Sequence, residues 1–210
     1  LSTVILAHGS MDTKTHDMNH DGFRDLPKAQ QINFANKWLW QSVGGTQIRW
    51  GWKYVDENRL GGENDYKKGL YDEMVNKLSV YGSHMDNRGF NAYFKLGTPV
   101  GASVYDEEED TELRSNIAIV ADYNRFSEDA YFGLNNFDAA EDSFWFNLSY
   151  AHYFSTRSSM IFGASLLANK SREDILNRWA ESRLGLPDVF RASNQTINKF
   201  QQLEPGVYAE

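Results

Sequence analysis

Residues 47–56 read Gln-Ile-Arg-Trp-Gly-Trp-Lys-Tyr-Val-Asp, and this stretch decides the fold. Apolar and aromatic side chains take every second position (Ile48, Trp50, Trp52, Tyr54), and the positions between them hold Arg49, Gly51, Lys53 and Val55. Successive side chains of a β-strand point to opposite faces of the sheet. The stretch therefore predicts a strand with one apolar face and one mainly hydrophilic face.

The same alternation recurs along most of the chain. It is found in residues 1–8, 31–40, 90–96, 117–124 and 143–154, and more weakly in 159–169. A further strand is expected near residues 80–85, and if it is continuous with 90–96, residues 85–89 form a bend within one strand. Together these runs predict about seven strands and an all-β fold. An open sheet of this kind would expose its edges, so the 210 residues are expected to be a piece of a larger barrel.

Two kinds of connection separate the runs. Short turns are expected at residues 41–46 and 155–158. The long polar segments 10–28, 58–77, 125–142 and 170–205 are expected to be external loops. Short turns at one end and long loops at the other are typical of outer-membrane barrels. Residues 98–115 break this pattern, because a long acidic segment, with Asp106–Asp110 at its centre, stands where a short turn is expected.

Aromatic residues are abundant, with 6 Trp, 11 Tyr and 13 Phe. Trp38, Trp40, Trp50 and Trp52 flank one short turn. Clustering near a turn is what a girdle of aromatic side chains at a membrane interface predicts. The alternative is a soluble sandwich or barrel with an aromatic core, although loops of this length are uncommon in compact soluble domains. No apolar run is long enough for a membrane-spanning helix.

Charge and cysteine content exclude several function classes. The formal net charge of −8 argues against nucleic acid as a partner, because phosphate recognition needs a basic surface. The chain has no Cys, which excludes disulfides, thiolate metal sites and cysteine nucleophiles. No nucleophile–base arrangement stands out, so we expect no enzymatic activity and no catalytic residue.

One loop contains a cation-binding motif. Residues 17–25 read Asp-Met-Asn-His-Asp-Gly-Phe-Arg-Asp, which matches the start of an EF-hand calcium loop. The expected calcium ligands are Asp17, Asn19, Asp21, the Phe23 carbonyl and Asp25. The position of the final bidentate Glu is occupied by Lys28 instead. The alternative interpretation is an Asx-rich turn that binds no metal.

Two further loops are candidates for contact with a ligand. Residues 59–66 follow a strand and end at Tyr66, and residues 131–138 contain Tyr131, Phe132 and Asn135. These four side chains are the predicted ligand-binding set. The alternatives are a bend in the first segment and a loop held together by its own aromatic side chains in the second. Residues 171–184 have helical apolar spacing, and Gly185 and Pro187 would end such a helix.

The order of these motifs resembles one membrane-protein family. Leu6-Ala7-His8-Gly9 precedes the Asp17–Pro27 loop, and an Asn33-Phe34-x-Asn36-x-Trp38 strand and Asp56-Glu57-x-Arg59-x-Gly61-Gly62 follow it. The aromatic loop from Tyr131 and the strand Phe144–Phe154 continue the series. This order is similar to the front half of the barrel of TonB-dependent outer-membrane receptors in the style of Bacteroidetes. The plug domain and the energy-coupling box of that family are not matched.

The resemblance implies one segment of a transmembrane barrel of about 22 antiparallel strands in the cell outer membrane. It implies uptake of a scarce nutrient of the cobalamin, haem or siderophore class. The implied partners are that small molecule, outer-membrane lipid, the TonB complex acting through the plug, and a surface lipoprotein. Calcium in an external loop near the ligand would suit Asp17, Asn19, Asp21 and Asp25. The alternative function is a soluble calcium-binding β-rich adhesion or binding module.

Overall fold

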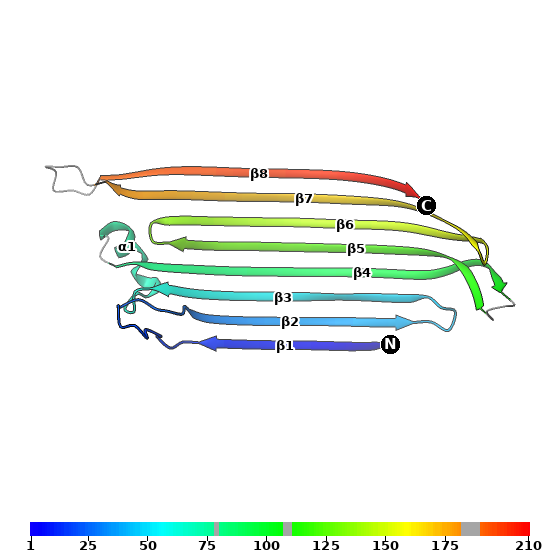
Figure 1. Cartoon of the computed structure of the whole chain (residues 1–210), viewed down its shortest axis with the longest axis horizontal. Coiled ribbons are helices and arrows are strands. Elements are labelled where there is room, and N and C mark those ends of the chain that lie inside the picture. Colours follow the sequence, from blue (N-terminus) through cyan, green and yellow to red (C-terminus); the bar gives the residue numbers. More distant parts are fainter. Residues whose placement is uncertain (78–79, 107–110, 182–189) are drawn as a thin grey trace.

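The computed structural model describes residues 1–77, 80–106, 111–181 and 190–210. Within them, eight strands form one antiparallel sheet whose spatial order is the chain order (Figure 1). The strands are β1 (Ser2–Asp12), β2 (Lys28–Gln41), β3 (Gln47–Gly62), β4 (Gly82–Asp106), β5 (Thr111–Phe132), β6 (Asn135–Ser155), β7 (Ser158–Glu181) and β8 (Phe190–Ala209). A 3-10 turn, η1 (Lys68–Leu70), and one helix, α1 (Tyr71–Lys77), lie between β3 and β4. The all-β prediction is confirmed, with eight strands described where about seven were expected.

The register keeps the alternation of neighbouring strands in phase. Trp38 of β2 lies opposite Trp50 of β3, and Trp50 lies opposite Phe94 of β4. The row continues through Ala121 and Phe146 on the next two strands. Directly opposed residues share a face of the sheet. Apolar positions from neighbouring strands therefore gather on one face, and polar positions gather on the other.

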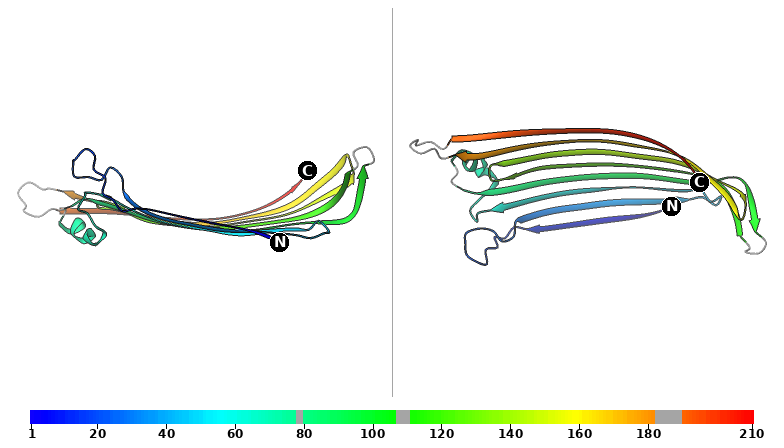
Figure 2. Two further views of the ribbon diagram at one scale, coloured as in Figure 1. Left: turned by 90° about the horizontal axis from the view of Figure 1, so that it is seen from below. Right: turned by 45° about the horizontal axis from the view of Figure 1, so that its top comes forward.

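The sheet is a single, shallowly curved layer. Figure 2 shows α1 on its convex side and the loop between β1 and β2 on its concave side. Among the described residues, the outer edges of β1 and β8 pair with no further strand. No helix in the described ranges has the length and apolarity needed to cross a membrane.

The tight turn between β2 and β3 depends on glycine. Gly45 has φ of +87°, a conformation that side chains with a Cβ adopt rarely. The Ser42 and Thr46 backbones close the turn, with the Ser42 N–H donating to the Thr46 carbonyl at 2.8 Å. The short turn predicted at residues 41–46 is therefore present.

The segment 125–142 is a hairpin and not the long loop that was expected. β5 continues to Phe132 and β6 begins at Asn135, so only Gly133 and Leu134 connect them. Both faces of this hairpin carry polar residues near Arg125 and Asp142. The side chains therefore no longer alternate between apolar and polar here, although the backbone pairing of β5 and β6 continues.

The acidic segment 98–115 is also mostly strand. β4 extends to Asp106 and β5 starts at Thr111, with a register shift between Pro99 and Ser103. Gly101, at φ of +78°, lies within this irregularity, which is typical of a β-bulge. Most of the predicted acidic run, residues 107–110, lies outside the described residues.

The helix predicted for residues 171–184, and the external loop predicted for 170–205, are wrong over the described part. β7 runs to Glu181 and β8 starts at Phe190. Ile175 lies opposite Phe137 of β6 and Thr196 of β8, so pairing on both sides prevails over local helical spacing. Gly185 and Pro187, the predicted helix end, lie outside the described residues.

Candidate functional site

The face of the sheet that carries Trp50 is the convex face. Met74 of α1 packs with Tyr66 and Tyr131, and α1 lies on the convex side (Figure 2). Tyr131 lies opposite His84 of β4, and His84 lies opposite Leu60 of β3. Leu60 is an even number of residues from Trp50, so the two share a face.

The convex face carries a broad apolar band. Trp38 and Trp50 stack with their ring centroids 5.9 Å apart, and Phe34 stacks on Trp52 at 5.1 Å. The band crosses the whole sheet and includes Ile5, Trp40, Phe90, Phe94, Ile119, Phe144, Phe146, Leu148, Phe162, Leu166, Leu203 and Val207. Many of these side chains are exposed; Leu203 keeps 67% of its surface and Val207 88%. An exposed apolar surface of this extent marks a contact with lipid or protein.

Charged residues border the band toward the end of the sheet that holds α1. Arg88 lies 3.6 Å from Asp56, and Arg125 lies 3.9 Å from Asp142. Farther along the same face, Lys68 of η1 lies 3.3 Å from Asp86. The convex face therefore changes from apolar to ionic along the strands.

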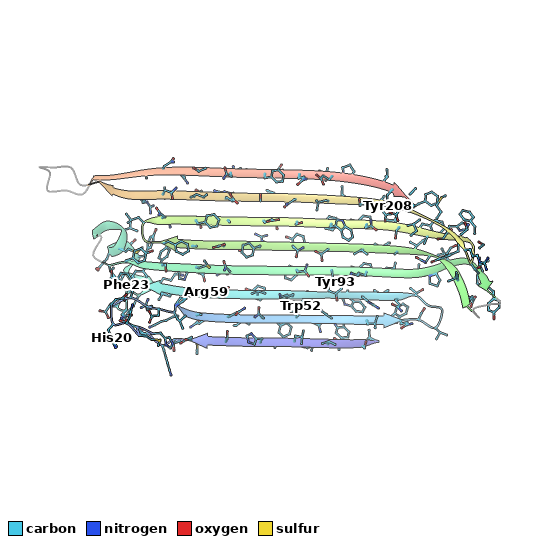
Figure 3. The ribbon with its side chains drawn as sticks, in the orientation of Figure 1. His20, Phe23, Trp52, Arg59, Tyr93 and Tyr208 are labelled. Atoms are coloured by element: carbon cyan, nitrogen blue, oxygen red, sulfur yellow. The ribbon has the colours of Figure 1, made fainter. Side chains whose placement is uncertain are left out.

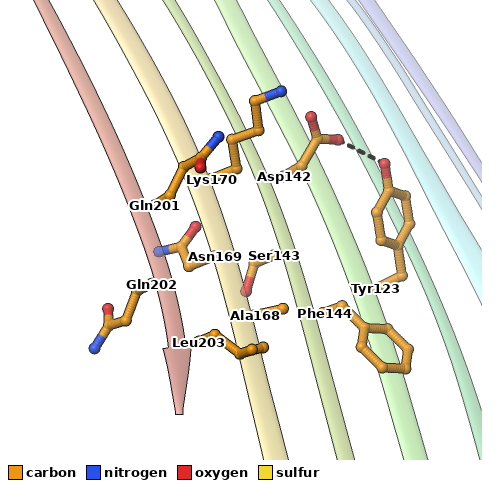
Figure 4. A pocket seen from close by; sticks show the side chains of 10 residues that line it. All are labelled: Tyr123, Asp142, Ser143, Phe144, Ala168, Asn169, Lys170, Gln201, Gln202 and Leu203. Atoms are coloured by element: carbon orange, nitrogen blue, oxygen red, sulfur yellow. Dashed lines mark hydrogen bonds between the residues drawn. The ribbon is translucent and has the colours of Figure 1, made fainter.

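A shallow pocket of about 430 Å³ lies at this boundary on β5–β8 (Figure 4). Phe144 and Leu203 line its apolar part, and Lys170 lies at its polar side. The Tyr123 hydroxyl donates a 2.6 Å hydrogen bond to Asp142 beside it. The pocket therefore has one apolar side and one polar side, like the boundary on which it lies.

The concave face carries most of the amide and charged side chains over the same length, together with the apolar Val120, Trp145 and Leu167. Asn91 donates to Asp122 at 3.1 Å and to Asn124 at 2.7 Å across neighbouring strands. Figure 3 places Tyr93 of this face and Trp52 of the convex face in the middle of the sheet. Other polar residues of the concave face are Asn33, Lys53, Ser143, Asn147, Asn169 and Gln202.

The predicted cation loop is folded by hydrogen bonds among its own groups. The Asp17 carboxylate accepts from the Gly22 N–H at 3.1 Å and from the Asn64 side chain at 2.6 Å. Asp21 accepts from the Phe23 N–H at 2.8 Å, and Asp25 accepts from the Met18 N–H at 2.6 Å. These are the contacts of Asx-type turns.

The loop places its predicted ligands near one another but does not form a metal cage. The Asn19 side chain donates to Asp21 at 2.9 Å, so its amide nitrogen faces that carboxylate. Over the part of the chain that the structure describes, no three His, Cys, Asp or Glu side chains are arranged to hold a metal ion. Calcium binding at Asp17, Asn19, Asp21, Phe23 and Asp25 stays a prediction.

Hydrogen bonding and burial oppose each other at Asp17. Burial raises the pKa of the Asp17 carboxyl, but hydrogen bonds from Asn64 and from backbone N–H groups outweigh it, and the pKa lies below its ordinary value. The charged form of Asp17 therefore favours the folded loop.

Arg24 ties this loop to the β3–β4 connection. Its guanidinium donates to the carbonyls of Gly61, Asn64 and Tyr66 at 3.2, 2.8 and 2.6 Å. Burial lowers the pKa of Arg24, and the charge of Asp65 opposes this shift. This role of Arg24 could not be predicted from the sequence, because arginines in polar loops are usually solvated.

The predicted ligand-binding side chains divide between two environments. Tyr66 is fully buried and Tyr131 is 6% exposed; their hydroxyls lie 2.7 Å apart beneath α1. In this structure neither offers a surface to a ligand, and both form the core of the β3–β4 connection. Phe132 and Asn135 lie opposite each other on the concave face, where Phe132 is exposed. Figure 3 shows His20 and Phe23 at the same end of the sheet.

Sequence reasoning also missed the polar partners beneath α1. His84 is buried, and its Nε2 lies 2.8 Å from the Asn58 amide nitrogen. The residue that could have indicated this packing from the sequence is Gly82, because a Cβ there would lie 2.1 Å from the Tyr66 ring. A glycine inside a strand often marks such a close approach.

Compared with known proteins, the chain matches no family model, no curated protein and no solved structure.

Proposed function

We propose that this sheet is part of the wall of an outer-membrane β-barrel, with its convex face against lipid and its concave face lining an aqueous interior. The observation that carries the proposal is the division of the two faces. Apolar side chains gather on the convex face, and amide, hydroxyl and charged side chains gather on the concave face. Lipid-facing and lumen-facing residues alternate in this way along barrel strands.

The shape of the sheet supports a wide barrel. The bend seen in Figure 2 runs along the strands, which stay close to one layer over their middle, and both edges of the sheet are open among the described residues. Closure into a barrel would join these edges to further strands, because unpaired backbone groups cannot face hydrocarbon. A barrel of about 22 strands is consistent with a sheet so nearly flat across its strands.

The placement of the connections gives the proposed orientation. The loop with Asp17 and the connection with α1 lie at one end of the sheet, and the tight turn at Gly45 lies at the other (Figure 1). Long loops of outer-membrane barrels face outside and short turns face the periplasm. The α1 end is therefore proposed to face outside.

Transport is the finer proposal, and it rests on the sequence resemblance. We infer TonB-dependent uptake of a scarce nutrient, a metal chelate such as cobalamin, haem or a siderophore, without covalent chemistry by this chain. The soluble adhesion module is the weaker candidate, because no second layer covers the apolar band on the described residues apart from α1 at one end. An apolar surface left in water promotes association.

Partition tests the wall proposal. The protein is refolded from urea in buffer alone, or in the presence of neutral detergent micelles or phosphatidylcholine vesicles. We expect aggregation in buffer and a dispersed, β-rich, protease-resistant species with detergent or lipid. A compact, soluble monomer in buffer would overturn the proposal.

Calcium at the Asp17 loop has its own test. Tryptophan fluorescence is followed during calcium titration of the refolded protein and of Asp21→Ala. A saturable response that the variant loses would support the site, since Asp21 is a predicted ligand. An unresponsive protein at millimolar calcium would remove it.

A further inference from the structure

Gly51 lies at the centre of a group of long side chains on the concave face. Lys37 of β2 and Tyr93 of β4 are its cross-strand neighbours, and Arg49 and Lys53 are its neighbours on the same face of β3. Gly51 itself is buried, and a Cβ there would lie 3.0 Å from the Tyr93 ring. The Tyr93 ring therefore lies across β3 where a side chain would otherwise stand.

Four cations surround Gly51 on this face. Lys95 lies opposite Arg49, and it adds to Lys37, Arg49 and Lys53 on three neighbouring strands. All four side chains are exposed. Lys95 lies directly opposite Arg49, and Lys37 is diagonal to both Arg49 and Lys53, so each cation has a neighbour within about 8 Å. Arg49 and Lys53 are four residues apart, about 13 Å along β3, so the four charges form one patch of roughly that length.

These cations are not neutralised by the rest of the sheet. Within the described ranges, none of the four forms an ion pair with a carboxylate, and Arg49 reaches only the Gln47 amide oxygen, at 3.3 Å. The nearest acidic position, Asp122, lies opposite Tyr93 and accepts hydrogen bonds from Asn91. In a chain with a net charge of −8, an unpaired cluster of this kind is a local exception.

The cluster is bordered by a cavity with further hydrogen-bond donors. A hollow of about 730 Å³ follows the concave face beside Lys37, Lys53 and Tyr93. Asn33 and Asn91 line the same hollow. Lysine ammonium groups, amides and a tyrosine hydroxyl together suit oxygen-rich anions, because each offers N–H or O–H donors to a charged acceptor.

We propose that the cationic patch around Gly51, with the cavity beside it, binds a small polyvalent oxyanion, with two or more carboxylate or phosphate groups held by Lys37, Arg49, Lys53 and Lys95. The binding site itself follows from the sheet alone. That the anion is a solute on its way through the barrel rests on the proposed function.

Equilibrium binding tests the site. The protein, refolded in neutral detergent, is titrated calorimetrically with citrate and with pyrophosphate at low ionic strength. The test variant is Lys37→Gln/Lys53→Gln. The matched control is Lys170→Gln/Lys199→Gln, which removes the same charge from the convex face. All four substituted lysines are exposed, and the circular-dichroism spectrum of each variant in detergent verifies its β structure.

We expect saturable binding of both probes that weakens about tenfold or more in the test variant and changes less than about twofold in the control. Added salt should weaken binding, because exposed charges are screened. Equal loss in both variants, or binding of polyglutamate but of neither small anion, would overturn the proposal. A protein that inserts into vesicles yet binds neither anion would refute this inference and leave the wall proposal standing.

Discussion

Placing an arginine on each face of β5 gives the sharpest energetic test of the two-faced sheet. Ala121 lies on the convex face in the Trp50 row, and Ala118, three residues away, lies on the concave face opposite Gly97 and Ser149. Both alanines are partly exposed, so neither substitution fills a packed core. Ala121→Arg and Ala118→Arg therefore differ in the face they charge and in little else.

The expected cost follows from depth in the band. Ala121 lies four residues from Arg125, the first charged residue above it on the convex face, which is about 13 Å along the strand. For a strand tilted by about 40°, this places Ala121 about 10 Å below the ionic border, near the middle of the hydrocarbon layer. An arginine there costs about 2–4 kcal/mol, and one facing the lumen costs close to zero.

The assay is reversible folding from urea into phosphatidylcholine vesicles, followed by tryptophan fluorescence. The free energy of unfolding should fall by about 2–4 kcal/mol in Ala121→Arg and by less than about 1 kcal/mol in Ala118→Arg. Equal losses, or a larger loss at Ala118, would refute the assignment of the faces.

Three further predictions concern the loops. Replacing Arg24 by Met removes its bonds to three carbonyls and should cost about 2–3 kcal/mol of loop stability, measured as faster amide exchange in residues 13–27. Folding lowers the pKa of Asp17, so the stabilising effect of its charge is present above the ordinary carboxyl value of 3.8 and is lost as pH falls through the lower folded pKa. Proteolysis of the loop should therefore become faster below pH 3.8. Asp17→Asn should already show this faster proteolysis at about pH 7. Gly82→Ala should displace Tyr66, lower the stability of the β3–β4 connection by about 1–3 kcal/mol and speed proteolytic cleavage of residues 63–81. The control is Gly97→Ala on the same strand, where a Cβ meets no atom within 4 Å and cleavage should not change.

The fold is readable from sequence only where side chains differ between faces. Around Trp50 the convex residues are aromatic and the concave ones polar, so the alternation predicts the strand. Beyond Arg125 and Asp142 both faces are polar, so the sequence predicts a loop where the structure has a hairpin. The segment around Ile175 and Leu176 has the apolar spacing of a helix. It is nevertheless a strand, because β6 and β8 supply hydrogen bonds to it on both sides.

The candidate site was predictable to a similar degree. The Asp17 loop was found from its motif, and its turn contacts follow from the chemistry of Asp and Asn. Arg24 was missed because its partners are backbone carbonyls of a distant segment. Gly51 within an aromatic strand is a signal of close approach that sequence reasoning can use, and the Tyr93 ring is what approaches.

The central claim, that the convex face meets lipid and the concave face meets water, is tested most directly by a spin-label scan of β5. The chain contains no Cys, so single cysteines at residues 117–124 can be labelled without background. In vesicles, collision with oxygen should peak at 117, 119, 121 and 123, and collision with a water-soluble nickel complex should peak at the positions between them. Labels that show no alternation, or the opposite phase, would contradict the account.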